Sequence, residues 1–277
     1  MVTPDVRRYV RRSLLVLAML TLLQACASRP APDGEPPRSG SNVPLHLPDD
    51  AIPRDDPRSR YGNGPYYQVF GETYKVLDTN YGYRERGVAS WYGSKFHGRP
   101  TSSQEPYDMY AMTAAHRSLP LPSYVRVRNL HNGKSVIVRV NDRGPFAENR
   151  LIDLSYVAAM KLDMVTAGTS LVEVTAISFD EPPAPREPEI ADNTPQNDGA
   201  PSVFVQVGAF GEAENARRRF VMLRDIGIDK AFVHKDGNAS PALYRVRIGP
   251  IASVTQYDSI VEQLQDLGIS ESHLVTE

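Results

Sequence analysis

The segment YVRVRNLHNGKSVIVRVNDRGP, residues 124–145, decides the fold of the central part of the chain. Valines alternate with other residues in 124–129 and again in 135–140, which is the pattern of strands with one buried face. Asn132-Gly133 between them is a strong signal for a tight hairpin turn. The segment therefore predicts two antiparallel strands, the second of which ends in the polar run Asn141 to Pro145.

Other short elements surround this hairpin. Strands are predicted at 87–92 and 169–179, and a short helix is predicted to begin near Asp153 or Ser155. Several short strands with one small helix are typical of a compact, mainly-β barrel. We place this domain at residues 61–180.

The C-terminal part contains an internal repeat. VQVGAF at 205–210 matches VRIGPI at 246–251, and residues 223–228 match 264–269 at the same offset of 41. Each half reads as a strand followed by a helix, and a further strand completes each half near 230–234 and 273–276. This predicts a small α+β, ferredoxin-like domain at 202–277, with two helices on one face of a four-stranded sheet.

Strand parity divides the two faces of that sheet. Val203, Val205 and Val207, with Val246 and Ile248 in the other half, should meet the helices. The opposite parity gives a set of polar and aromatic residues that suits a ligand platform, although a merely solvated face has the same pattern. This set is Phe204, Gln206, Arg245 and Arg247.

Composition separates these domains. The 277 residues correspond to about two domains, and 14 of the 23 prolines fall within 26–60 and 181–201. Both stretches lack the apolar content of a core, so we expect disordered, extended tethers. The formal net charge of −2 gives no general argument for nucleic-acid binding.

The first residues read as an export signal. A basic cluster, Arg7 to Arg12, precedes the apolar run 14–23, which is too short for a comfortable membrane span. The run ends in Leu22-Leu23-Gln24-Ala25-Cys26, which resembles a bacterial lipobox, so we expect residues 1–25 to be removed and Cys26 to carry a diacylglycerol. A plain cleaved signal is the alternative. Because Cys26 is the only cysteine, the chain has no internal disulfide and no cysteine-based metal site.

Polar residues concentrate in two stretches of the barrel, 96–116 and 141–146. The candidate catalytic residues there are Glu105, Asp108, His116 and Asp142, a set suited to acid/base work on a glycosidic bond. Each has a structural alternative: turn or cap residues for the first two, a buried core histidine for the third, and an arginine-paired carboxylate for the last. The spacing matches no helical metal motif, so neither a metal nor a cofactor is expected.

Several motifs resemble known families. The barrel segments resemble the double-psi β-barrel of the rare lipoprotein A family: GVASWYG at 87–93, FHGRPT at 96–101, YDMYAMTAAH at 107–116 and VRVNDRGP at 138–145. FVQVGAF at 204–210 and YRVRIGP at 244–250 resemble the SPOR domain. An RNA-binding sheet of similar shape would carry paired stacking aromatics, which are missing here, and export argues against RNA.

The resemblance implies a lytic transglycosylase that cleaves bonds between N-acetylmuramic acid and N-acetylglucosamine in peptide-free peptidoglycan, leaving 1,6-anhydromuramyl ends. Matched positions would place Glu105, Asp108, His116 and Asp142 in the cleft, with Asp142 as the acid and His116 orienting a carboxylate. SPOR domains bind peptide-free glycan at the division septum. The expected location is an outer-membrane lipoprotein, anchored through Cys26, that faces the periplasm of a Gram-negative bacterium and acts during daughter-cell separation.

One position departs from the family pattern. The family usually has glycine before the glutamate, where Gln104 stands here. If that turn requires a positive φ, Gln104 is strained and can shift Glu105. Two non-catalytic alternatives stay open: an expansin-like glycan binder, and a tether that links the outer membrane to the cell wall.

Overall fold

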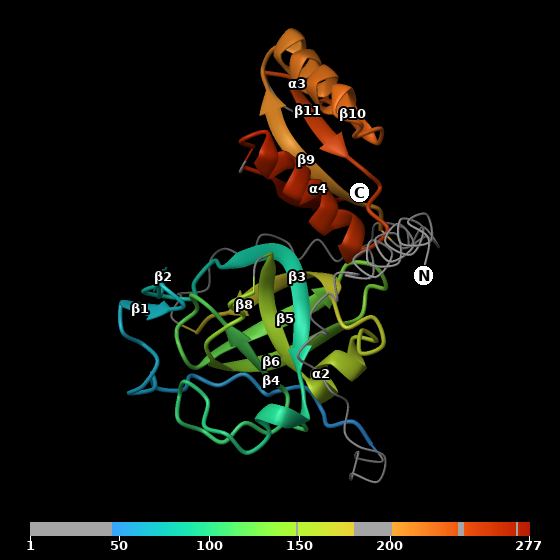
Figure 1. Ribbon diagram of the computed structural model, residues 1–277. Helices are drawn as coiled ribbons and strands as arrows, with labels where there is room; N and C mark the ends of the chain where they lie inside the picture. Colours follow the sequence, from blue (N-terminus) through green and yellow to red (C-terminus); the bar gives the residue numbers. More distant parts are fainter. Residues whose placement is uncertain (1–45, 148, 180–200, 238–240, 270) are drawn as a thin grey trace, which may run out of the picture.

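The computed structural model describes residues 46–147, 149–179, 201–237, 241–269 and 271–277. A β-barrel is followed by a smaller α+β domain, and the two lie against each other (Figure 1). The expected signal, Cys26 and nearly all of the second tether lie outside the described residues. Within the described ranges, no helix is long and apolar enough to cross a membrane.

Six strands close the barrel in the order β3-β7-β4-β6-β5-β8. The pairs β3–β7 and β4–β6 are parallel, and the other four are antiparallel. The strands are β3 (Arg84–Tyr92), β4 (Thr113–His116), β5 (Ser123–Asn129), β6 (Ser135–Asp142), β7 (Arg150–Ser155) and β8 (Ser170–Ile177). One turn of 3-10 helix, η2 (Ser94–Phe96), follows β3.

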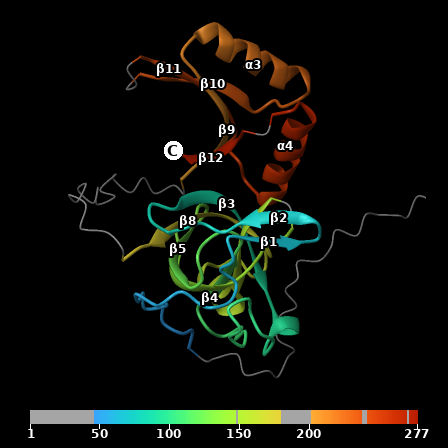
Figure 2. The ribbon, with the colours of Figure 1, turned by 90° about the vertical axis from the view of Figure 1, so that its left-hand side faces the viewer.

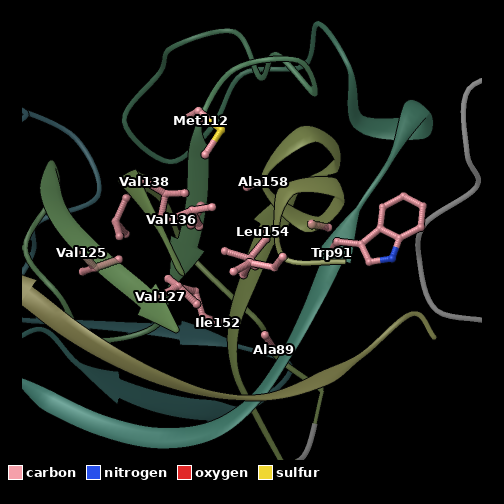
Figure 3. Close-up of a cluster of buried hydrophobic side chains, with 14 of the residues drawn as sticks. Ala89, Trp91, Met112, Val125, Val127, Val136, Val138, Ile152, Leu154 and Ala158 are labelled. Atoms are coloured by element: carbon pink, nitrogen blue, oxygen red, sulfur yellow. The ribbon is translucent and has the colours of Figure 1, made fainter. Parts of the chain in front are cut away.

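The predicted hairpin is confirmed. β5 and β6 pair antiparallel with Val125 opposite Val138 and Val127 opposite Val136, and Gly133 in the turn has φ 72°. These four valines are buried in the barrel core (Figure 3). Burying each such side chain contributes about 1.5–3 kcal/mol, which fixes the register because a one-residue slip would expose all of them.

Two strands of the barrel, β4 and β7, were not predicted. β4 has only four residues, and β7 contains Asp153, which the sequence offered as a helix cap. Ser155 is the cap, because its Oγ accepts a hydrogen bond from Ala158 N at 3.3 Å before α2 (Tyr156–Lys161). Asp153 is therefore free of a capping role and belongs to a strand.

The start of the barrel domain lies earlier than expected. Residues 46–60, predicted to be part of the tether, follow the barrel surface. Ala51 N donates to Ile137 O at 3.0 Å, and Ser59 N donates to Leu121 O at 2.9 Å. Prolines prevent regular strand pairing here, but single backbone bonds between them still hold the segment in place.

A small hairpin leans on the barrel. It consists of β1 (Tyr66–Val69) and β2 (Glu72–Lys75), joined by Phe70-Gly71. The Tyr67 hydroxyl donates to Arg117 O at 2.9 Å, which attaches the hairpin to the residue after β4.

The C-terminal domain confirms the expected α+β fold. Its antiparallel sheet has the order β10-β11-β9-β12, and α3 packs against three of these strands. The elements are β9 (Val203–Phe210), α3 (Ala213–Asp225), β10 (Ala231–Asp236), β11 (Leu243–Ile248), α4 (Val254–Asp266) and β12 (His273–Thr276). Gly227 and Gly268 follow the two helices with φ 89° and 70°, as glycines at helix ends do.

The two domains touch along β3 and β12 (Figure 2). Arg86 Nη1 donates to Leu274 O at 3.4 Å, and Arg150 lies 4.0 Å from Asp258. Val88 from the barrel joins the apolar cluster of the second domain. The interface is thus partly apolar and partly ionic.

Candidate active site

The polar loop after η2 folds onto the end of β6. Thr101 N donates to Glu105 O at 2.8 Å, and Gln104 N donates to Thr101 O at 2.9 Å. Ser103 N reaches Asn141 O at 3.3 Å. The loop is therefore a closed turn attached to the last residues of a core strand, and it brings Glu105 to the same end of the barrel as Asp142.

Asp142 ends β6 and holds this loop through one oxygen. Its Oδ1 accepts hydrogen bonds from Ser102 N at 2.8 Å, Ser102 Oγ at 2.7 Å and Arg143 N at 2.8 Å. Among the described residues, no hydrogen bond is formed by Oδ2. One carboxylate oxygen thus holds the loop against the end of β6.

Glu105 is held by two residues of β6. Its Oε2 accepts from Arg139 Nη1 at 2.6 Å and from Asn141 Nδ2 at 2.9 Å. Burial raises the pKa of Glu105, but the hydrogen bonds from Arg139 and Asn141 outweigh it, so the pKa lies below its usual value. Arg139 also contacts Asp56 at 3.2 Å. Glu105 is consequently ionised at neutral pH, which suits a charge-stabilising group better than an acid.

The backbone of Gln104, the residue before Glu105, is strained, as the departure from the family pattern predicts for a turn with positive φ. Gln104 has φ 68°, in the left-handed region that favours glycine. The side chain is exposed and the loop keeps its hydrogen bonds. The strain, on the order of 1–2 kcal/mol, is borne by the turn without displacing Glu105 from Arg139.

Asp108 lies apart from this pair. Its Oδ1 accepts from Tyr110 N at 2.9 Å, an Asx turn, and lies 3.7 Å from His97 Nδ1. Its side chain is 54% exposed. Asp108 contacts neither Glu105 nor Asp142. In the structure it stabilises a turn, which is the structural alternative that the sequence analysis gave for this residue.

His116 is a buried histidine with both ring nitrogens bonded. Its Nδ1 accepts from Ser118 N at 3.2 Å and Leu119 N at 3.1 Å, so the ring proton lies on Nε2, 2.8 Å from the Tyr83 hydroxyl. The pKa of His116 is lowered to about 3, mainly by burial and further by the positive charges of Arg117 and Arg143.

The expected hydrogen bond from His116 to a catalytic carboxylate is therefore wrong. The ring is neutral and turned toward Tyr83, whose hydroxyl lies 2.8 Å from Glu85 Oε2. Its link to the site runs through the backbone instead, because Arg143 Nη1 donates to His116 O at 3.1 Å.

Arg143 connects several segments around the site. Its side chain is buried, and Nη2 and Nε donate hydrogen bonds to Gly62 O at 2.7 and 2.9 Å. Nη1 donates to His116 O, and the backbone N–H of Arg143 donates to Asp142 Oδ1. It also lies over the Tyr67 ring, 5.7 Å from the centroid. The arginine thus ties Asp142 to the lead-in segment and to the β1–β2 hairpin.

Sequence reasoning missed Asp153 as a candidate. It sits on β7 with its Oδ1 accepting a hydrogen bond from Ser90 Oγ of β3. A Cβ built on Gly144 would lie 3.9 Å from Asp153 Oδ2, so this carboxylate approaches the backbone two residues after Asp142. The available signal was a single acidic residue among the apolar residues Leu151, Ile152 and Leu154.

The second candidate surface lies on the C-terminal sheet. Arg247 contacts Glu277 and, at 3.4 Å, Gln206 Oε1, while Arg245 Nη2 lies 2.8 Å from Asp236. Phe204 packs against Phe232, with ring centroids 5.6 Å apart. Phe204 and Arg247 are only 9% and 8% exposed, so the face is more closed than strand parity implied.

No cluster of three or more metal-binding side chains is found in the part of the chain that the structure describes. The carboxylates at this end of the barrel are those of Asp142 and Glu105, with Asp153 approaching the backbone at Gly144.

Comparison with known families agrees with both domains. Residues 84–174 match the family model described as lytic transglycolase, and residues 199–276 match the SPOR domain. The fold and these two matches define a peptidoglycan lytic transglycosylase that carries a SPOR domain.

Relatives narrow this class. A protein from Vibrio cholerae called endolytic peptidoglycan transglycosylase RlpA is 37% identical over 96% of this chain and 98% of its own length. The protein of the same name from Pseudomonas aeruginosa strain UCBPP-PA14 is 34% identical over 91% of this chain and 88% of its own. The chain belongs to the RlpA family.

Proposed function

We propose that the chain cleaves the bond between N-acetylmuramic acid and N-acetylglucosamine within peptide-free glycan strands and leaves 1,6-anhydromuramyl ends. The observation that carries this proposal is the pair Asp142 and Glu105, held by one loop at one end of the barrel. Two carboxylates with different surroundings allow one to carry a proton and the other to stay charged.

Asp142 is the proposed acid. In this scheme its Oδ2 delivers a proton to the glycosidic oxygen as the bond to the muramyl C1 breaks. The muramyl C6 hydroxyl then attacks C1 from within the same sugar and returns its proton to the Asp142 carboxylate. No water is consumed, and the residue ends in the protonation state in which it began.

The remaining candidates have supporting roles. The Glu105 carboxylate is ionised and stabilises the positive charge that develops at C1 in an oxocarbenium-like transition state. Asp108 is exposed at its turn, and in this scheme it accepts a hydrogen bond from a sugar or acetamido group. His116 is a positioning residue that braces Arg143 through its backbone oxygen.

Asp153 is the alternative acid. Its hydrogen bond to Ser90 and its approach to Gly144 put it beside the same strand end as Asp142. Separate substitution of the two decides between them.

The rest of the chain directs this activity. We propose that Cys26 carries a lipid anchor, that the protein is held at the outer membrane and faces the periplasm, and that the following tether spans the distance to the wall. The SPOR domain, through the surface of Phe204, Gln206, Arg245 and Arg247, concentrates the enzyme on peptide-free glycan at the septum, where its cuts assist daughter-cell separation.

Mass spectrometry of digested glycan tests the proposal. Peptide-free strands incubated with the protein should gain internal anhydromuramyl ends, while strands that keep their stem peptides should not. Binding without new anhydro ends would instead identify an expansin-like binder or a wall tether.

A further inference from the structure

The β1–β2 hairpin carries an aromatic residue where local structure disfavours one. Phe70-Gly71 is a two-residue hairpin loop with φ 52° and 87°, the geometry in which Asn-Gly is preferred. A bulky residue at positive φ is a backbone outlier. The Phe70 side chain is also 92% exposed. Neither the conformation of the turn nor burial in a core explains a phenylalanine here. Contact with a ligand is the remaining use for an exposed aromatic ring at a strained position.

Phe70 is the outer member of an aromatic cluster. Its ring stands edge-on to Phe146, with centroids 6.5 Å apart, and Phe146 in turn lies 5.4 Å from Tyr74. Tyr74 stacks on Tyr67 at 5.3 Å. The inner rings pack on one another and the outer ring is open to solvent, so the cluster presents an exposed aromatic surface.

This cluster is continuous with the proposed cleft. Phe146 follows Asp142 by four residues, so their Cα atoms lie at most about 14 Å apart. Arg143 joins the two physically, since its N–H bonds Asp142 Oδ1 and its guanidinium lies over Tyr67. A strand bound across Asp142 would therefore pass the aromatic surface within a few sugar units.

We propose that Phe70 and Phe146 form a stacking subsite for the glycan strand beside the catalytic carboxylates, with Phe70 contributed by the hairpin that precedes the region matched by the lytic transglycolase model. The inference rests on the proposed function. The apolar C–H face of an N-acetylated sugar and its acetamido methyl are the groups that an edge-on pair of phenyl rings receives. This subsite positions long strands and favours cuts within them.

A fluorescence experiment reads this subsite without requiring cleavage. Trp91 is the only tryptophan of the chain and is 3% exposed, so an indole introduced by Phe70→Trp reports its own surroundings. The full-length variant carries Asp142→Asn as well, so that the strand is not cut. Soluble peptide-free glycan should shift the emission of this indole to shorter wavelength in a saturable way.

The matched control is Tyr66→Trp. Tyr66 is 61% exposed on the same hairpin, but its strand parity places it on the face opposite to Tyr67. Its indole should not respond to glycan. An unchanged Phe70→Trp signal while the same protein co-sediments with glycan would overturn the inference. A shift with phosphatidylethanolamine–phosphatidylglycerol vesicles but none with glycan would also overturn it, because it identifies a membrane contact.

A second variant keeps the test decisive. Phe70→Asn suits the turn, so the melting temperature should be retained or raised, while turnover of long strands falls about fivefold. Unchanged turnover would contradict the subsite even if Phe70→Trp folds poorly. If the unsubstituted chain makes no anhydro ends but the indole still responds, the proposed reaction fails and the glycan subsite stands.

Discussion

Asp142→Asn separates the structural and chemical uses of one carboxylate. An asparagine oxygen can replace Oδ1 and accept the same hydrogen bonds from Ser102 N, Ser102 Oγ and Arg143 N. What the variant changes is Oδ2, which becomes an NH2 group with no acidic proton to deliver. Because the three hydrogen bonds to Oδ1 are kept, the free energy of unfolding should change by less than about 1 kcal/mol.

The effect on catalysis should be much larger. An amide cannot deliver a proton to the glycosidic oxygen, and general acid catalysis contributes about 10²–10⁴ in rate. The release of anhydromuramyl ends should therefore fall by about that factor, measured by mass spectrometry under saturating peptide-free glycan. Thermal melting of the same sample shows how much folded protein is present.

Ser102→Ala is the matched control. It removes the Ser102 Oγ bond at 2.7 Å but leaves the Asp142 carboxylate in place. We expect a stability loss of about 1–2 kcal/mol and less than a tenfold loss in rate. If Asp142→Asn keeps more than a tenth of the activity, its role is to hold the loop. A far greater loss in Asp153→Asn would then assign the acid to Asp153.

Three further outcomes follow from the site. Glu105→Gln should lower the rate by at least tenfold and weaken the Arg139 contact, and the ratio of kcat to KM effects on defined glycan measures whether the loss is in the transition state. Gln104→Gly should relieve the strain at φ 68°, so chemical denaturation should show equal or slightly higher stability with no loss of activity. Because the pKa of His116 is lowered to about 3 in the folded chain, stability should fall as pH drops below about 6.5, by at most about 1.4 kcal/mol per pH unit. His116→Gln should flatten that slope between pH 6.5 and 4, and an unchanged slope would show that another group takes up the proton.

Much of the fold could be predicted because its signals are local. The alternation of Val125, Val127, Val136 and Val138 records which side of each strand is buried, and Asn132-Gly133 records where the chain turns. β4 and β7 were not predicted, because a strand of four to six residues has too few repeats of its pattern to be distinguished from a loop or the start of a helix.

The lead-in shows a second reason for error. Composition predicted that residues 46–60 are a tether, yet Asp56 lies within 3.2 Å of Arg139 and accepts a hydrogen bond from Tyr124 at 2.8 Å. A high proline content indicates that a segment does not form regular secondary structure. It does not indicate whether a neighbouring domain provides hydrogen-bond partners for that segment.

The sequence by itself determined the mainly-β and α+β classes of the two domains and the buried faces of the β5–β6 hairpin. Those are properties of neighbouring residues and of periodicity. Only the tertiary structure decided that His116 faces Tyr83 rather than a carboxylate, and that Asp153 approaches Gly144. Barrel closure pairs strands far apart in the chain, so the partners of a polar side chain depend on which strands become neighbours.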